Sequence, residues 1–427
     1  MNMRLLSLIV TAALACDPSI VVADAIEISG PTMGTKYKVV IDTPPEDFDA
    51  VSLQGKIEAK LAEINQQMST WDEASEISRF NQSASTDWID VSPEFAGVVL
   101  EAKQIFELSE GAFDPTVEPL IKLWGFGDRR RKEVPSAEDV ADGLQHTGMA
   151  NLKVRLAPPA LRKTIGRLQL NLSAIAKGYA VDAVAELMQS EGLPAYVVDI
   201  GGENKAGKAK ASGEPWKLGV ESPLGGLQRV VRLTESSIAT SGDYRNFFEM
   251  DGIVYSHAID PTTGWPVKNP PASVSVVAES CMTADAWATA MMVLGAERGA
   301  VIAERSGLSV MFQEVSTNRQ VEETVFGVFA DSEDVSAVAK PAKQSSGSMP
   351  WFPFVAAAAI FLIAVAGMAI GTMVQNKSLK GSCGGLASMP GSEGKSICEL
   401  CTIPKNECTN AELREQMQAA SETSDQV

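Results

Sequence analysis

The chain has 427 residues, a formal net charge of −18 and a hydrophobic content of 45%. This length exceeds that of one ordinary domain, which holds about 100–200 residues. The acidic excess argues against nucleic acid as a partner, because binding a phosphate backbone requires a basic surface.

Residues 1–25 predict a secretory signal that does not belong to the fold. Arg4 precedes an apolar stretch, residues 5–15, that is too short to span a bilayer. Three outcomes stay open for this segment: cleavage after the Ala-Asp-Ala sequence 23–25, lipidation at Cys16 as in bacterial lipoproteins, or retention as an uncleaved anchor.

Residues 26–335 predict one mixed domain of the α+β class. Apolar residues recur at helix spacing in some segments and at strand spacing in others, without strict alternation of strand and helix. We therefore expect strands that pair mainly antiparallel. The helices are expected at 50–68, 93–109, 174–190 and 284–305. The strands are expected at 26–29, 37–41, 196–200, 217–220, 230–233, 237–240, 252–259, 273–277, 308–314 and 323–328.

A linker and one membrane helix are expected after this domain. Residues 336–350 are rich in Ser, Ala, Pro and Lys, a composition typical of flexible linkers. Residues 351–375 lie in a window without charged residues and are mostly apolar. About 20 such residues suffice to cross the hydrocarbon core of a bilayer as a helix. The sequence therefore predicts a transmembrane helix at 351–375.

The tail, residues 376–427, predicts a small Cys-rich metal-binding segment. Four of the six cysteines crowd into it, namely Cys383, Cys398, Cys401 and Cys408. Thiols on the reducing side of a membrane favour a metal site over disulfides. Thiolates suit iron or zinc, and a reduced tail without metal is the alternative.

A secretory start followed by a late membrane helix also predicts the topology. We expect a protein of the bacterial inner membrane, with the large domain in the periplasm and the tail in the cytoplasm. Lys377 and Lys380, just beyond the membrane helix, agree with the excess of basic residues found on the cytoplasmic side.

The segment 283–289 predicts a cation site. Asp285 and Thr289 are four residues apart, so on a helix both oxygen-bearing side chains project from one face. Thr283 is the expected N-cap of that helix. One of only two histidines lies upstream, in the segment 257–264. A carboxylate and a hydroxyl near a rare histidine suit a hard cation that handles phosphate, and an ordinary solvated helix start is the alternative.

Two further motifs are read in the same way. The segment 199–203, Asp-Ile-Gly-Gly-Glu, follows an apolar strand, so its glycines either let the backbone approach a ligand or form a plain tight turn. Lys177 stands at an expected helix start, where a cation is poorly placed against the helix dipole. That placement indicates an anionic ligand, with simple solvent exposure as the alternative.

Eight segments in chain order resemble the ApbE family. They are MGTKYKV (33–39), MSTWDEASEISRFN (68–81), GAFDPTVEPLIKLWGFG (111–127), LNLSAIAKGYAVD (170–182), VVDIGGE (197–203), ATSGDYRNFFE (239–249), HAIDPTTG (257–264) and TADAWATAMMVLG (283–295). These proteins are FAD:protein FMN transferases, and the resemblance covers residues 26–330. It implies an ApbE-like mixed domain of helices and antiparallel sheet. Such enzymes bind FAD with Mg²⁺, cleave its pyrophosphate, attach FMN to a threonine hydroxyl of an exported protein and release AMP.

The resemblance also implies residue roles. Asp285 and Thr289 match Mg²⁺ ligands, together with the backbone carbonyl of Ala174. The positions that match contacts to FAD, the substrate, are Met33, Trp71, Ala112, Phe113, Asp114, Asn171, Lys177 and Ile259. Asn171 departs from the aspartate often found at its position, so that contact would be neutral.

His257 matches a histidine near the reacting phosphate. A neutral threonine is a poor nucleophile, and histidine titrates in the range useful for a general base. We expect His257 in that role, with Asp260 orienting it or sharing the work. The alternative is that transfer depends on positioning and electrostatics alone.

The segment KSLKGSCGGL, residues 377–386, resembles NqrM, a small membrane protein needed to mature the sodium-pumping NADH:quinone oxidoreductase. The resemblance implies that the tail assists iron delivery to that complex. It also implies that flavoprotein subunits of this or a related complex accept the FMN. Two alternatives stay open: an FAD pyrophosphatase that gives FMN and AMP, and a non-catalytic, membrane-anchored FAD-binding protein.

Overall fold

The structure is a computed structural model that describes residues 25–126, 133–242, 247–250 and 253–335. These residues lie in one compact unit within Met1–Lys340. The predicted linker, membrane helix and Cys-rich tail, and all but the last residue of the predicted signal, lie outside the described residues. Across the described part of the chain, no helix combines the length and the apolar character that crossing a membrane requires.

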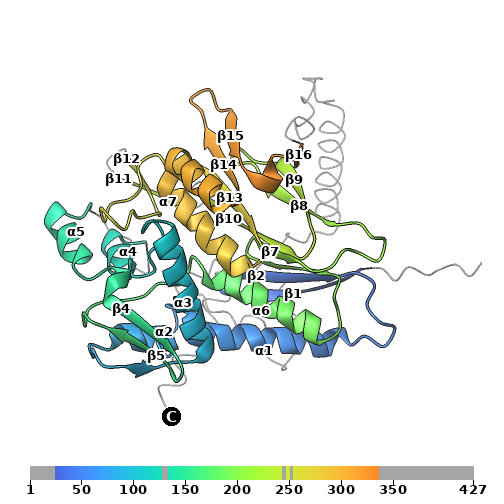
Figure 1. Cartoon of the computed structure of the whole chain (residues 1–427), viewed down its shortest axis with the longest axis horizontal. Helices are drawn as coiled ribbons and strands as arrows, with labels where there is room; N and C mark the ends of the chain where they lie inside the picture. Colours follow the sequence, from blue (N-terminus) through green and yellow to red (C-terminus); the bar gives the residue numbers. More distant parts are fainter. Residues whose placement is uncertain (1–24, 127–132, 243–246, 251–252, 336–427) are drawn as a thin grey trace, which may run out of the picture. The chain divides into compact units, whose positions relative to one another are not determined.

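An eight-stranded sheet forms the centre of the fold (Figure 1), and all of its neighbouring strands pair antiparallel. In spatial order the strands are β1 (Ile26–Thr32), β2 (Thr35–Ile41), β6 (Tyr196–Ile200), β7 (Glu203–Ala206), β10 (Ser236–Gly242), β13 (Ser273–Ala278), β14 (Ser309–Val315) and β15 (Val321–Val325). Because side chains alternate between the faces of a strand, each strand contributes to two cores. Val198 and Phe312 belong to one core, whereas their neighbours Val197 and Met311 belong to the other.

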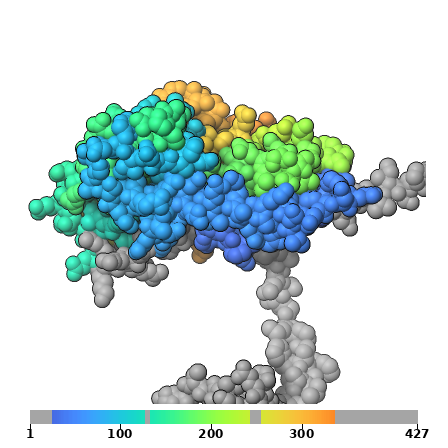
Figure 2. Space-filling view, turned by 90° about the horizontal axis from the view of Figure 1, so that it is seen from below, coloured from blue at the N-terminus to red at the C-terminus, as the bar shows by residue number. Residues whose placement is uncertain are grey.

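The α-helices of the described residues are α1 (Ala50–Met68), α2 (Glu76–Gln82), α3 (Pro93–Leu108), α4 (Glu118–Trp124), α5 (Ala137–Leu144), α6 (Ala176–Ser190) and α7 (Cys281–Ser306). Helices α1, α6 and α7 cover the first face of the sheet (Figure 1). α6 packs against β6, α7 packs against β10 and β13, and the two helices contact each other. α1 packs against α6. The blue N-terminal segments run along the face shown in Figure 2.

Three smaller sheets complete the described fold. One consists of β16 (Glu333–Asp334), β9 (Leu227–Leu233) and β8 (Trp216–Glu221), and its apolar residues share the second core with the large sheet. Another consists of β3 (Ile89–Asp90), β5 (Pro159–Lys163) and β4 (Leu152–Leu156). The third is the hairpin of β11 (Phe247–Met250) and β12 (Ile253–Ser256).

The antiparallel α+β prediction is confirmed, and three of its details are corrected. The strand expected at 252–259 ends at Ser256. The helix expected from 174 begins at Ala176. The expected N-cap Thr283 lies inside α7, because Ser280 caps the helix and its Oγ accepts from the Thr283 N–H at 3.3 Å. The Thr283 hydroxyl instead donates to Glu101 Oε1 at 2.9 Å.

Candidate active site

The first turns of α6 and α7 meet at Gly178. A Cβ atom at this position would lie 2.4 Å from the Cys281 carbonyl oxygen and 2.8 Å from Asp285 Cβ. Contacts this short do not occur between real side chains and backbone, so only glycine permits the approach. The Gly178 N–H donates to Asp285 Oδ2 at 3.0 Å. The backbone of α6 therefore fixes the Asp285 carboxylate directly.

Two oxygen atoms at this site, the Ala174 carbonyl and Asp285 Oδ1, accept no hydrogen bond from the described residues. α6 begins at Ala176 with Ile175 as its N-cap, so Gly178 lies in the first turn, where backbone N–H groups have no partner within the helix. The Gly178 N–H finds its partner in Asp285, and the Ala174 carbonyl, which precedes the helix, accepts no hydrogen bond from any described residue. Asp285 Oδ1 likewise has no hydrogen-bond partner among the described residues. Two strong acceptors are thus left for a ligand.

The hydroxyl of Thr289 lies one turn after Asp285 on α7, as the spacing predicts. Its Oγ1 is 3.2 Å from Ser241 Oγ, which belongs to β10. Ser241 is a site residue that the sequence did not single out. The carbonyl of Ala174, the carboxylate of Asp285 and the hydroxyl of Thr289 are all oxygen donors, which Mg²⁺ prefers.

The electrostatics of Asp285 also fit a cation. Only 4% of this residue is exposed, and burial raises the pKa of its carboxyl, while the charge of Lys177 and the Gly178 N–H partly oppose that rise. A raised pKa means that the surroundings compensate the negative charge incompletely. A bound divalent cation would supply the missing compensation.

Within the described residues, no group of three or more His, Cys, Asp or Glu side chains is arranged to hold a metal ion. A cation at Asp285 would therefore depend on the backbone carbonyl, the hydroxyl and oxygen atoms of its substrate. This is the usual situation for Mg²⁺ in phosphate-handling sites, where few protein oxygens bind the ion.

Lys177 forms an ion pair with Glu203 of β7. Glu203 is only 3% exposed, and burial together with the charge of Asp285 raises its pKa to about 7, although Lys177 opposes the shift. Burial works against the charge of Lys177, but the carboxylates of Asp285 and Glu203 hold its pKa above the ordinary value. The cation at this helix start is therefore matched by two carboxylates.

Glu203 is a second residue that sequence reasoning did not select. Gly201 and Gly202 have φ angles of 65° and 108°, and Ile200 pairs with Glu203 across them, so the glycines form the tight turn between β6 and β7. The available signal was an acidic residue placed directly after two turn glycines at the start of a strand. Its partner could not be read from the sequence, because Lys177 lies 26 residues away.

Asp114 and Asn171, two residues predicted to contact FAD, lie on neighbouring segments of the chain. The Asn171 N–H donates to the Pro115 carbonyl at 2.7 Å, and its Nδ2 donates to Glu118 Oε2 at 2.7 Å. Asp114 is buried, and burial raises its pKa, while hydrogen bonds from Thr116 oppose the rise. The structure thus brings Asp114 and Asn171 into one region.

The other residues predicted to contact FAD range from buried to largely exposed. Ala112 and Phe113 are buried in the main core. Met33 lies in the β1–β2 turn with a φ angle of 48°. Trp71 is 73% exposed, and no described hydrogen bond joins it to α6 or α7. A large exposed aromatic side chain of this kind is free to stack on a planar ligand.

The segment with His257 follows β12 and packs against α4. Ile259 is buried beside Leu120 and Trp124, and the Trp124 Nε1–H donates to the Gly264 carbonyl at 2.8 Å. Asp260 Oδ1 accepts from the Thr262 N–H at 2.8 Å, so this oxygen stabilises its own turn. The roles expected for His257 and Asp260 stay predictions.

Comparison with known proteins decides the family. The profile described as the ApbE family matches residues 33–312. A Vibrio cholerae protein named FAD:protein FMN transferase is 44% identical over 293 residues, which cover 68% of this chain and 87% of that protein. The chain belongs to the ApbE family. An Escherichia coli K12 protein of the same name is 37% identical over 66% of this chain and 82% of its own length. The ApbE family member described here is accordingly an enzyme of the transferase class.

Solved structures agree with this membership. The structure titled flavin transferase ApbE from Vibrio cholerae matches with a TM-score of 0.66 at 40% identity, over 72% of this chain and 99% of that chain. The apo form of the Pseudomonas stutzeri flavinyl transferase ApbE matches with a TM-score of 0.67 at 36% identity, over 72% of this chain and 96% of that one. Separately, residues 372–422 match the profile described as (Na⁺)-NQR maturation NqrM. That match includes the four tail cysteines, which lie outside the described residues.

Proposed function

We propose that the described domain transfers FMN from FAD to a threonine hydroxyl of an exported or membrane acceptor protein, in a reaction that depends on Mg²⁺. The relatives named FAD:protein FMN transferase support the reaction class. One observation of the site supports the metal: the Gly178 N–H holds Asp285 through Oδ2, while Asp285 Oδ1 and the Ala174 carbonyl have no hydrogen-bond partners among the described residues. Oxygen atoms left in this way suit Mg²⁺.

Ala174, Asp285 and Thr289 would hold the ion, which when bound neutralises charge on the pyrophosphate of FAD. Lys177 adds a fixed positive charge next to Asp285, and its pairing with Glu203 limits the positions it can adopt. Asp114 and Asn171 would contact FAD with polar atoms from two neighbouring loops. The exposed ring of Trp71 offers a surface for the planar part of FAD.

In the transfer step the acceptor threonine oxygen forms a bond to the phosphorus of the FMN half of FAD. The bond between that phosphorus and the oxygen bridging to AMP breaks, and AMP leaves with the bond's electron pair. We assign His257 as the base that takes the threonine proton, with Asp260 as its auxiliary group. The negative charge that develops on the reacting phosphate is stabilised by groups that are positioned before the reaction begins. In phosphoryl transfer such stabilisation is the main source of catalysis.

The C-terminal part of the proposal concerns maturation of a respiratory complex. The match of residues 372–422 to NqrM supports a role for the tail in iron delivery to a sodium-pumping NADH:quinone oxidoreductase. The acceptors would then be flavoprotein subunits of that complex or a related one. The topology that serves both roles has the transferase domain in the periplasm, a helix at 351–375 in the inner membrane and the tail in the cytoplasm.

The test is incubation of the full-length protein in detergent with FAD, MgCl₂ and a candidate acceptor subunit, followed by mass analysis of the acceptor. A gain of one FMN supports transfer. Free FMN and AMP with an unmodified acceptor would instead identify an FAD pyrophosphatase. Binding of FAD without turnover would identify a binding protein. An acceptor whose threonine is replaced by alanine is the matched control.

A further inference from the structure

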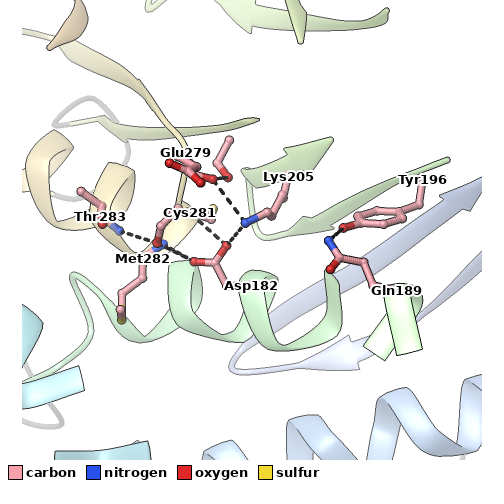
Figure 3. A network of polar contacts seen from close by, with 10 residues as sticks. Asp182, Gln189, Tyr196, Lys205, Glu279, Cys281, Met282 and Thr283 are labelled. Atoms are coloured by element: carbon pink, nitrogen blue, oxygen red, sulfur yellow. Dashed lines mark hydrogen bonds and ion pairs between the residues drawn. The ribbon is translucent and has the colours of Figure 1, made fainter. Parts of the chain in front are cut away.

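The carboxylate of Asp182, on α6, binds the start of α7 from outside that helix (Figure 3). Its Oδ2 accepts from Ser280 Oγ at 2.7 Å and from the Met282 N–H at 2.9 Å. Its Oδ1 accepts from the Cys281 N–H at 3.0 Å and from Lys205 Nζ at 2.7 Å. One carboxylate therefore makes four charge-assisted or capping contacts.

These contacts complete the N-terminus of α7. The first N–H groups of a helix have no partner within it and need capping from elsewhere. Ser280, the N-cap, serves only the Thr283 N–H, so Asp182 serves the Cys281 and Met282 N–H groups that come before it. A negative charge at this end also interacts favourably with the helix dipole.

Lys205 fixes Asp182 in turn. It lies on β7, two residues after Glu203, so both side chains project from the same face of the strand. Each pairs with α6: Glu203 binds Lys177, and Lys205 binds Asp182. The Lys205 ammonium group also donates to the Glu279 carbonyl at 3.2 Å, next to the start of α7. β7 thus ties α6 and the α7 start together at two points.

We propose that Asp182, held by Lys205, is a positioning residue for the cation site. Its contacts fix the first turn of α7, and Asp285 stands one turn further along the same helix. Without the Asp182 carboxylate the N–H groups of Cys281 and Met282 lose their partners, so the first turn of α7, which carries the helix to Asp285, is fixed less firmly. This inference rests on the proposed function, because it assumes that Asp285 binds a divalent cation.

Outer residues that orient metal ligands typically change metal affinity by about 10–100-fold when they are replaced. We therefore expect the Asp182→Ala protein to bind a divalent cation about 10-fold more weakly or worse. Lys205→Met should act in the same direction with a smaller effect, because the carboxylate stays. Asp182→Asn, which keeps one acceptor oxygen, should fall between wild type and Asp182→Ala.

The experiment titrates MnCl₂ into the full-length protein with FAD present and acceptor absent, and follows free Mn²⁺ by electron paramagnetic resonance. This measurement separates affinity from the number of sites. A residue needed only for folding would lower the number of sites and leave their affinity unchanged. Glu186→Gln is the matched control, since Glu186 is an exposed carboxylate one turn after Asp182 on α6.

The inference is supported if Asp182→Ala and Lys205→Met raise the Mn²⁺ dissociation constant while Glu186→Gln does not. It is overturned if the variants keep wild-type affinity, with or without a loss of sites. If Asp182→Ala does not fold, Asp182→Asn and Lys205→Met decide the question. Asp285→Ala separates failure of this inference from failure of the proposed metal site. If the Asp285→Ala protein binds Mn²⁺ as wild type does, the proposed metal site fails and this inference fails with it.

Discussion

Replacing Gly178 by alanine tests the contact between α6 and α7 most sharply. The added Cβ would lie 2.4 Å from the Cys281 carbonyl oxygen, and an ordinary contact begins near 3.4 Å, so the helices must separate locally by the difference, 1.0 Å. Overpacking of this kind costs about 1–3 kcal/mol of unfolding free energy. A misplacement of about 1 Å at catalytic groups can also lower the rate about 100-fold.

The assay is urea unfolding of the variant together with FMN transfer as a function of MgCl₂ concentration. Gly55→Ala is the matched control, because a Cβ there meets nothing within 4 Å and Gly55 is exposed inside α1. That control should be neutral or more stable by up to about 1 kcal/mol. If Gly178→Ala matches Gly55→Ala in both stability and rate, the close approach of the helices does not position Asp285.

Three further predictions follow from other residues. Glu203→Ala should cost about 2 kcal/mol in urea unfolding, because Lys177 loses a charged partner; a neutral result would mean that the pair is not formed in solution. Burial lowers the pKa of Lys163 to about 8 from 10.5. The unfolded chain therefore binds the extra proton between these values, and stability should rise with pH from 8 toward 10.5, by at most about 3.5 kcal/mol at about 1.4 kcal/mol per pKa unit. Lys163→Met should abolish that rise, and an unchanged slope would refute the assignment. Purified full-length protein should contain iron or zinc by elemental analysis, and replacing Cys383 and Cys401 by serine should remove it; retained metal would contradict the tail site.

Periodicity predicted the long elements well, because their burial pattern depends on residues close in sequence. α1 spans Ala50–Met68 as expected, and β6 spans Tyr196–Ile200 as expected. Shorter elements such as α4 and the β4–β5 hairpin were missed. They carry few apolar repeats, and they are stabilised by contacts made after the chain folds.

The site was predictable only where its geometry is local. Asp285 and Thr289 share a helix, so their spacing alone placed them one turn apart. The partners that complete the site come from distant segments: Glu203 reaches Lys177 across 26 residues, and Asp182 reaches Cys281 across 99. Such pairs follow from the way distant helices and strands pack together, which a single sequence does not specify.

The most direct test of the proposed function is the mass of the acceptor subunit after incubation with FAD and the wild-type or Asp285→Ala protein, each with MgCl₂ or with EDTA. The proposal predicts that wild-type protein with MgCl₂ adds one FMN to a threonine. It predicts an unmodified acceptor with EDTA or with Asp285→Ala. Equal modification by both proteins in EDTA would contradict a cation site at Asp285, and an acceptor left unmodified by wild-type protein with MgCl₂ would contradict the transfer itself.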